Sequence, residues 1–377
     1  MIPLNLPPAS SPEIDLPPRI LLGPGPSMVP PRVLRVMSTP PVGHMDASYL
    51  AIMDRTQELL RYVFQTENAL TLVVPGTGTA AMETAVANMV EPGDAVLVCV
   101  NGYFGLRIAE MARRCGGDVR IITRPWGEVF NADDIRAALV ERPARVVALV
   151  HGETSTGAAQ PMEGIAAAVH DYDSILIVDT VASLGGVPFA VDALDIDVCY
   201  TGSQKCLSAP PGLGPITLGP RAVQKLEARR APVASWYLDL TLLRQYWDSR
   251  RVYHHTAPIN LSLALYEALR LVAEEGLEAR WARHRRCAEM LWNGLEALGL
   301  ALHVAPEHRL PSLTTVRVPE SVDEAAVRSR LLAEMNIEIS GGLGELKGRI
   351  WRIGLMGYSA REENVLALLG ALDRLLG

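Results

Sequence analysis

The sequence predicts an α/β fold: a doubly wound, mostly parallel sheet with helices on both faces, followed by a smaller C-terminal α+β domain. Two observations lead to this prediction. Between residues 49 and 218, short apolar runs alternate with helical patterns, which is the order of elements in a parallel sheet. From residue 261 this alternation gives way to long helical stretches and then to a mixed pattern. With 377 residues, 49% of them apolar, the chain is long enough for two domains.

The chain divides into three parts. Residues 1–20 are rich in proline, which excludes a helix and favours an extended arm. The apolar side chains of this arm favour docking across a subunit boundary, and a disordered tail is the alternative. We expect the large, ligand-binding domain over residues 21–260. Residues 261–377 should form a long linking helix and the small C-terminal domain.

Hydrophobic periodicity places the individual elements. In the large domain it predicts a helix over 49–64, a strand over 70–74, a helix from the turn at 75–81 to about residue 90, strands over 95–100 and 119–123, a helix over 133–141, a strand over 146–150, a helix over 162–172, and strands over 174–178, 198–201 and 216–218. Residues 236–251 look irregular. The last part should contain two helices within 261–299, a strand over 313–318, a helix over 324–335, strands over 337–340 and 349–354, and a helix over 362–376.

Two of these strands end in a charge. The runs 174–178 and 198–201 are too short for helices and are bounded by turn residues, so they indicate buried parallel strands. Asp179 and Lys205 then emerge at carboxyl ends of strands, where open α/β sheets bind ligands. A lysine and an aspartate at one sheet edge fit pyridoxal phosphate: the amine can bond to its aldehyde, and the carboxylate can keep its pyridine nitrogen protonated. A buried Asp–Lys ion pair is the alternative, and this stretch alone does not decide.

The turn at residues 75–81, Pro-Gly-Thr-Gly-Thr-Ala-Ala, opens a helix and offers free backbone N–H groups to a phosphate. Thr77 and Thr79 can add hydroxyl donors. The turn also matches a nicotinamide-binding fingerprint, but the next strand ends in Asn101 where that fold needs an acidic residue. Because the Lys of a Walker motif is also missing, a phosphate monoester is the better ligand. A helix start without a ligand is the alternative.

Other candidate residues lie in loops or strands that should reach the same edge. Phe104 can stack on a flat heterocycle, with core packing as the alternative. Thr154 lies in a loop rich in hydroxyls, which can also be a solvated loop. Arg352 interrupts an apolar strand and needs a partner, either a substrate carboxylate or an internal acid. The stiff loops around Gly25 and His44 can line a site, although a lone histidine is more often structural.

Composition excludes several classes of function. A net charge of −7 without a basic cluster argues against nucleic-acid binding. The five cysteines show neither a CxxC pair nor zinc spacing, which predicts reduced thiols and a cytoplasmic protein. The adjacent His254 and His255 would point apart in a strand, so we expect no metal site. No apolar run is long enough for a membrane span, and the start of the chain lacks the basic region of a signal peptide.

Several motifs agree with one known family and keep its order from about residue 20 to the end. They are residues 21–27 (Leu-Leu-Gly-Pro-Gly-Pro-Ser), 101–105 (Asn-Gly-Tyr-Phe-Gly), 151–157 (His-Gly-Glu-Thr-Ser-Thr-Gly), 178–186 (Val-Asp-Thr-Val-Ala-Ser-Leu-Gly-Gly), 202–205 (Gly-Ser-Gln-Lys), 253–256 (Tyr-His-His-Thr) and 351–354 (Trp-Arg-Ile-Gly). Together they resemble the class V aminotransferases, which have the fold type I of pyridoxal-phosphate-dependent transferases. The resemblance is strongest to the alanine-glyoxylate and serine-pyruvate (serine-glyoxylate) group.

The resemblance implies a role for each matching residue. Lys205 would carry pyridoxal 5'-phosphate and move the substrate proton, Asp179 would face the pyridine nitrogen, and Phe104 would stack on the ring, where many members have Trp. The phosphate ligands would be Thr77, Gly78, Thr79 and Gln204, with Thr154 close by. Tyr253 and Thr256 would reach the phosphate of the neighbouring subunit, so the resemblance implies a homodimer with shared sites. The substrate-binding residues would be Arg352, which binds the carboxylate, together with Gly25, His44 and Asn260.

The resemblance implies an aminotransferase that moves an amino group from alanine or serine to glyoxylate or pyruvate by a ping-pong mechanism. The alternatives are an (S)-ureidoglycine-glyoxylate aminotransferase of purine catabolism or an aspartate-using relative. Asn260 resembles the ureidoglycine pattern, whereas His44 stands where those enzymes tend to carry Gln. A cysteine desulfurase is disfavoured by Phe104 and by the lack of cysteine after Cys287. A non-catalytic regulator would be expected to lose Lys205 or Arg352.

Overall fold

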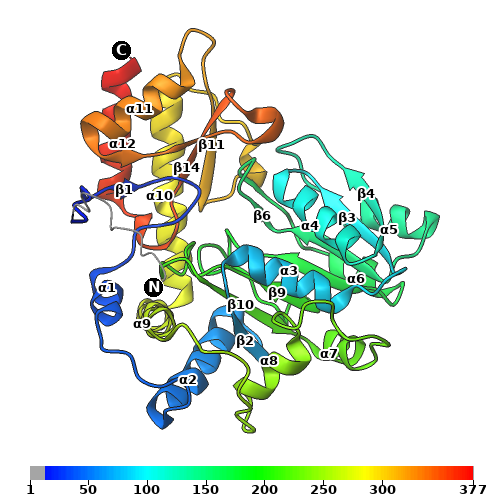
Figure 1. Cartoon of the computed structure of the whole chain (residues 1–377). Coiled ribbons are helices and arrows are strands. Elements are labelled where there is room, and N and C mark those ends of the chain that lie inside the picture. The colour runs from blue at the N-terminus through cyan, green and yellow to red at the C-terminus, as the bar shows by residue number, and fades with distance from the viewer. Residues whose placement is uncertain (1–12, 377) are drawn as a thin grey trace, which may run out of the picture.

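The computed structural model describes residues 13–376 and shows two parts, one above the other (Figure 1). The lower part is built round a seven-stranded sheet. The upper part contains a three-stranded sheet and the C-terminal helices, and α10 (Leu277–Ala297) runs up into it from the lower part. The predicted α/β class with a smaller α+β part is confirmed. The first twelve residues of the predicted arm lie outside the described residues.

The large sheet is mostly parallel, as predicted. Its strands lie side by side in the order β2, β10, β9, β8, β5, β3, β4. The strands β9, β8, β5, β3 and β4 are parallel, and β10 runs antiparallel to both of its neighbours. Their bounds are β2 (Leu70–Pro75), β3 (Ala95–Val100), β4 (Asp118–Thr123), β5 (Val146–Val150), β8 (Ile175–Asp179), β9 (Val198–Tyr200) and β10 (Leu213–Leu218).

The direction of winding reverses between β3 and β5. From β3 the chain moves outward to β4 through α4 (Tyr103–Arg114), then returns past β3 to β5 through α5 (Ala132–Glu141) and continues to β8 through α6 (Ile165–His170). Because such crossovers are right-handed, α4 lies on one face of the sheet and α5 and α6 on the other. The reversal leaves a crevice at the carboxyl ends of β3 and β5, which is where this fold binds ligands.

The remaining helices complete the two layers and the upper part. They are α1 (Pro31–Met37), α2 (Ala47–Phe64), α3 (Gly78–Met89), α7 (Pro220–Glu227), α8 (Leu240–Trp247), α9 (Ile259–Glu275), α11 (Glu324–Met335) and α12 (Glu362–Leu376). The short strands are β1 (Ile20–Leu21), β6 (Gly152–Glu153), β7 (Ala158–Ala159), β11 (Leu313–Arg317), β12 (Ile337–Glu338), β13 (Ser340–Gly341) and β14 (Ile350–Gly354). Within residues 13–376, no helix is both long and apolar enough to cross a membrane.

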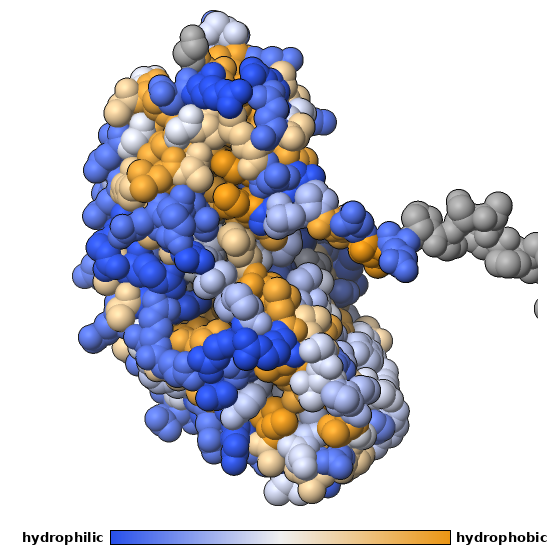
Figure 2. Space-filling model, turned by 90° about the vertical axis from the view of Figure 1, so that its left-hand side faces the viewer, coloured by the Kyte–Doolittle hydropathy of each residue, from blue (hydrophilic) through white to orange (hydrophobic). Residues whose placement is uncertain are grey.

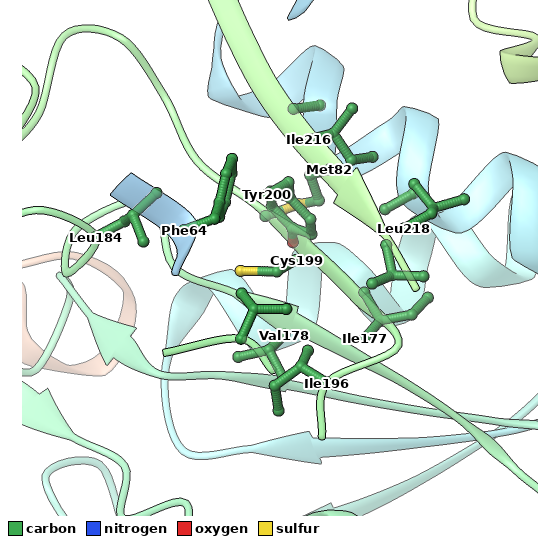
Figure 3. Packing of buried hydrophobic residues seen from close by; sticks show 14 of the residues in the cluster. Phe64, Met82, Ile177, Val178, Leu184, Ile196, Cys199, Tyr200, Ile216 and Leu218 are labelled. Carbon is green, nitrogen blue, oxygen red and sulfur yellow. The ribbon is translucent and has the colours of Figure 1, made fainter. Parts of the chain in front are cut away.

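Two main hydrophobic cores account for the two parts. In the first, Ile177, Cys199 and Ile216 of neighbouring strands pack with Met82 of α3 (Figure 3). Continuous apolar strands bury both faces of a sheet in this way. The second core lies between α10, α12 and the small sheet, and Trp351 is completely buried in it.

The structure differs from the sequence prediction in several places. Helices α1 and α7 were not predicted. Residues 236–251 are not wholly irregular, because Asp239 caps α8 by accepting a hydrogen bond from the N–H of Thr241. The predicted strand 337–340 is split, since β12 pairs with β1 and β13 pairs with β14. The start of the predicted large domain therefore pairs with the small one, and Leu22 belongs to the second core. The proposed boundary near residue 260 stays a prediction.

Figure 2 looks onto the face that carries α1 and α2. Hydrophilic residues break the apolar ones on this face into several separate patches, both on the small domain above and on the large domain below. The described end of the N-terminal arm is also exposed, with Ile14 90% and Leu16 80% accessible.

Candidate active site

A cavity of about 200 Å³ opens at the carboxyl ends of the parallel strands, beside the reversal of winding. Its walls come from the loops after β3, β5, β8 and β9 and from the first turn of α3. Many of the residues predicted from the sequence line this cavity: Gly78, Thr79, Phe104, Thr154, Asp179, Gln204 and Lys205. The expected convergence of separate loops on one sheet edge is therefore present.

Asp179 is the last residue of β8 and lies buried at this cavity. Its Oδ1 accepts a hydrogen bond from the N–H of Val181 at 2.8 Å, and its Oδ2 accepts one from the Tyr200 hydroxyl at 3.0 Å. Burial raises the pKa of Asp179 to about 7, although both hydrogen bonds favour the charged form. A cation in the cavity would keep this carboxylate ionised.

Lys205 lies in the loop that follows β9. Its Nζ donates a hydrogen bond to the backbone carbonyl of Pro24, and the Ser27 hydroxyl donates to the Lys205 carbonyl at 2.8 Å. Burial lowers the pKa of the amine to about 8. A larger fraction of this amine is therefore neutral near pH 7 than of an exposed lysine.

Asp179 and Lys205 do not pair with each other, although both line the cavity. Neither takes part in an ion pair within residues 13–376. The alternative of a structural Asp–Lys salt bridge is therefore wrong. Gly25 lies against the amine, since a Cβ there would be 2.5 Å from Nζ, and its φ of +105° also favours glycine.

The first turn of α3 forms an anion site at the cavity wall. Thr77 is the N-cap, but its side chain makes no capping hydrogen bond. Within residues 13–376, the N–H groups of Gly78 and Thr79 have no acceptor. The Gln204 Oε1 is likewise buried without a partner in the described structure. Free N–H donors at the positive end of a helix are suited to a phosphate.

Phe104 and Arg107 approach the cavity from α4. The Phe104 ring is partly buried, and the Arg107 guanidinium lies 4.8 Å from its centre. Arg107 also donates a hydrogen bond to the Thr79 hydroxyl at 3.0 Å. Arg107 is not among the site residues predicted from the sequence. Its spacing of three residues from Phe104 on a helix was the available signal, because such residues share a face.

Arg352 is 7% exposed on β14. Its guanidinium donates to the backbone carbonyl of Gly341 at 2.7 Å and to that of Thr154 at 3.3 Å. In the described part of the chain no carboxylate forms an ion pair with it, so a directly bonded internal acid is absent, and Glu153 acts on it only through its charge. Burial lowers the pKa of Arg352 to about 10. A buried guanidinium without an acid in direct contact is suited to an anionic ligand.

Seven predicted site residues are not part of the cavity lining. Three of them, Gly25, Thr77 and Arg352, lie next to residues that line it, as described above. The other four are His44, Tyr253, Thr256 and Asn260. Tyr253 is 59% exposed and its ring lies 5.1 Å from that of His44. Thr256 is exposed as well. The Asn260 amide donates to the carbonyls of Met37 and Thr39, each at 2.8 Å, and so holds the loop after α1. Their roles at a site stay predictions.

The sequence matches the family Aminotransferase class-V over residues 20–363. The chain belongs to the class V aminotransferases. The alanine-glyoxylate aminotransferase of Rattus norvegicus is 44% identical over 374 residues, which cover 98% of this chain and 90% of that protein. The (S)-ureidoglycine-glyoxylate transaminase of Bacillus subtilis is 42% identical over 382 residues, covering 97% and 92%.

Solved structures of this class V family have the same fold. The alanine-glyoxylate aminotransferase of Nostoc sp. superposes with a TM-score of 0.95 at 55% identity, over 99% of this chain and 98% of that one. The pyridoxamine-pyruvate aminotransferase of Mesorhizobium loti gives 0.90 at 29% identity, over 99% and 94%. The nicotinamide dehydrogenase that the glycine-rich turn could also indicate is thereby excluded.

Class V aminotransferases depend on pyridoxal 5'-phosphate, and the cavity fits this cofactor. The unpaired N–H groups of Gly78 and Thr79 and the orphaned Gln204 oxygen suit its phosphate. Asp179 suits a protonated pyridine nitrogen, and Lys205 supplies an amine for its aldehyde. When bound, the cofactor withdraws electrons from the substrate carbon. The predicted cofactor and the predicted enzyme class are both confirmed.

Proposed function

We propose that this aminotransferase moves an amino group from alanine or serine to glyoxylate or pyruvate by a ping-pong mechanism. The single observation that carries the choice of a small 2-amino acid is Arg352, a buried guanidinium that forms no ion pair within residues 13–376, beside a cavity of only about 200 Å³. One planar guanidinium binds one carboxylate in a bidentate manner. The relatives from Rattus norvegicus and Nostoc sp. named for alanine and glyoxylate support the same choice.

In this proposal each residue of the site has a separate role in the reaction. Arg352 holds the substrate carboxylate and so orients the bond to be broken at the substrate Cα. The Lys205 amine, with its pKa lowered to about 8, accepts the proton from that carbon and returns it in the second half of the reaction. Asp179 stays ionised against a cationic partner. Phe104 covers one side of the cavity and excludes water from it.

We also propose a homodimer in the cytoplasm, with Tyr253 and Thr256 reaching the phosphate in the neighbouring subunit. Both residues are exposed on their own chain. Beside them Trp236, 60% exposed, stacks on His254 with ring centres 4.4 Å apart. An exposed aromatic surface of this kind favours burial in an interface. The free thiols of all five cysteines support the cytoplasm.

Mixed dimers test the sharing of residues between subunits. Lys205→Ala and the double variant Tyr253→Ala/Thr256→Ala should each be inactive alone. If the two are unfolded and refolded together, half of the dimers are hybrids with one intact site, so about a quarter of wild-type activity should return. No recovery in a mixture shown by tagged pull-down to contain hybrids would rule out the shared site.

(S)-Ureidoglycine as donor is the second candidate, supported by the 42% identical relative from Bacillus subtilis. An aspartate-using enzyme is the third. Within one chain Asn260 holds the loop after α1, so any contact with substrate would have to be made at the partner's cavity. His44 lies near Tyr253, so it too could contact substrate only at the partner's cavity.

A donor screen decides among these. The purified protein with its cofactor is mixed with alanine, serine, aspartate or ureidoglycine, one at a time, and the cofactor absorbance is followed. Alanine or serine should convert it to the amine form within a turnover, and glyoxylate or pyruvate should restore it. Conversion by ureidoglycine or aspartate alone would overturn the choice of donor. If no donor converts it, the proposal of a small-substrate aminotransferase fails.

A further inference from the structure

Glu153 is a fully buried carboxylate close to the cavity. It ends β6, has no exposed surface, and forms no ion pair within residues 13–376. An unpaired buried acid is costly unless several hydrogen bonds satisfy it. Burial raises the pKa of Glu153, and hydrogen bonds from the residues around it act in the opposite direction.

The hydrogen bonds of Glu153 run to two sides of the cavity. Its Oε2 accepts from the N–H of Phe104 at 3.1 Å. Its Oε1 accepts from the N–H of Ser155 at 2.9 Å and from the Ser155 hydroxyl at 2.7 Å. Between these contacts stands Thr154, whose carbonyl accepts the hydrogen bond of Arg352. One side chain therefore fixes both the backbone that carries the stacking ring and the loop that meets the substrate-binding arginine.

Gly102 provides independent support for the contact between Glu153 and the start of α4. It is the N-cap of α4, where a polar side chain would normally satisfy the first N–H groups. Its φ of 178° is extended backbone open to any residue, so conformation does not demand glycine. A Cβ at this position would overlap with the side chain of Glu153. The absence of a side chain on Gly102 thus makes room for Glu153, which caps α4 from another strand.

We propose that Glu153 is a positioning residue that holds Phe104 and Thr154 in place around the bound cofactor. Through Phe104 it sets the height and tilt of the ring that covers the cofactor. Through the loop at Thr154 it keeps Arg352 aligned with the substrate carboxylate. This inference rests on the cofactor being held in the cavity, as described above. Glu153 itself does not line the cavity.

The negative charge of Glu153 also influences the protonation of other charged residues at the site. The charge of Glu153 acts on two other buried charged side chains, Asp179 and Arg352. The negative charge opposes the effect of burial on Arg352 and so favours its protonated form. It also favours the proton on Asp179, so that this carboxylate ionises fully only when a cation stands against it. A neutral residue in place of Glu153 would remove both influences.

The ordinary alternative is that Glu153 only caps a helix and contributes to stability. The two roles predict different results for Glu153→Gln. Loss of a cap lowers the melting temperature and leaves the bound cofactor unchanged. If Glu153 positions the site, the variant should change the environment of the cofactor. The NH₂ group of Gln must face the N–H of either Phe104 or Ser155, and two donors cannot form a hydrogen bond with each other.

The experiment measures the holoenzyme of Glu153→Gln and of Gly102→Ala, which keeps the acid but displaces it. For both we expect the dissociation constant of the cofactor to rise by about tenfold, as for a lost charged hydrogen bond. The visible circular dichroism of the bound cofactor should fall in parallel, and KM for the amino donor should rise through Arg352. In a Glu153→Ala background, Gly102→Ala should add little, because the overlap is gone.

Asp197→Asn is the matched control, since Asp197 is also a buried acid that accepts a backbone N–H but lies at the opposite end of the sheet. It should lower the melting temperature and leave the cofactor signal unchanged. If Glu153→Gln and Gly102→Ala behave like this control, the inference is overturned. If Glu153→Gln does not fold, Gly102→Ala alone decides in the same way. If wild type binds no cofactor, the assigned chemistry fails instead, and the two failures are thus distinguishable.

Discussion

The two ends of the large sheet differ in whether their buried charged side chains form ion pairs. At the amino end of β9, Asp197 accepts the N–H of Leu176 at 2.7 Å and contacts His170 at 2.9 Å and Arg221 at 3.4 Å. At the carboxyl end, Asp179 and Lys205 share a cavity without pairing. Both aspartates are buried, Asp179 at the end of β8 and Asp197 just before β9, but within residues 13–376 only Asp197 forms ion pairs.

This difference separates charges that hold the fold from charges that await a ligand. Burial raises the pKa of both aspartates, and at Asp197 the N–H of Leu176, the His170 ring and the Arg221 guanidinium oppose that shift. Asp179 instead relies on two hydrogen bonds and reaches a pKa of about 7. Arg352 likewise has only backbone carbonyls as partners. A buried charge that the chain leaves without its counter-charge is therefore the better sign of function.

The largest expected effect follows from Lys205→Ala. Activity should fall by at least about 10²–10⁴-fold, because the base that moves the substrate proton is lost. Borohydride should trap the cofactor on Lys205 in wild type and leave no adduct in the variant, as read by peptide mass. Lys225→Ala is the control, since Lys225 is paired with Asp94 at 3.0 Å and should not matter. An adduct on another lysine in the variant would contradict the assignment.

Arg352→Ala comes next. Removal of the guanidinium should cost about 2 kcal/mol of carboxylate binding, which raises KM for the amino donor roughly 30-fold with a smaller change in kcat. Arg352→Lys should recover only part of this loss, because an ammonium lacks the bidentate fork. The exposed Arg349 on the same segment provides the control Arg349→Ala. Unchanged KM values in Arg352→Ala for every donor would exclude the role.

Local sequence predicted the parts of the site that lie along one stretch of chain. The strands before Asp179 and Lys205 are continuous apolar runs, so both the strands and their charged ends could be placed. The turn before α3 was marked by glycine and threonine. The same pattern does not decide whether Asp179 and Lys205 pair, because pairing depends on side-chain direction, which strand periodicity does not specify at the ends of strands.

Residues that act through other segments escaped prediction. Glu153 meets Phe104 across 49 positions of sequence, and Tyr200 meets Asp179 across 21. No local pattern marks such pairs, since tertiary packing alone brings them together. The helix α8 was missed because it has only eight residues, too few for a clear period. Tyr253 is a different case, because the role proposed for it is at the site of a second subunit.

A smaller effect concerns pH. Only the neutral amine of Lys205 can attack the cofactor aldehyde, and a proton on the amine blocks it. The rate of cofactor uptake by apoprotein should therefore rise with pH and level off near the pKa of about 8, measured by stopped-flow absorbance. Desolvation lowers this pKa from its ordinary 10.5. A rate that keeps rising tenfold per pH unit beyond 9 would show an unshifted lysine and a wetter cavity.

The smallest effect on activity is expected at the paired end of the sheet. Asp197→Asn keeps the shape of the side chain but removes the charge that His170 and Arg221 share. Loss of one partner from a buried ionic cluster should lower the free energy of unfolding by about 3 kcal/mol, measured by urea denaturation. Activity per folded molecule and the trapped adduct on Lys205 should stay at wild-type values. A change in either would mean that the two ends of the sheet are coupled, and that counter-charges at one end tune the unpaired charges at the other.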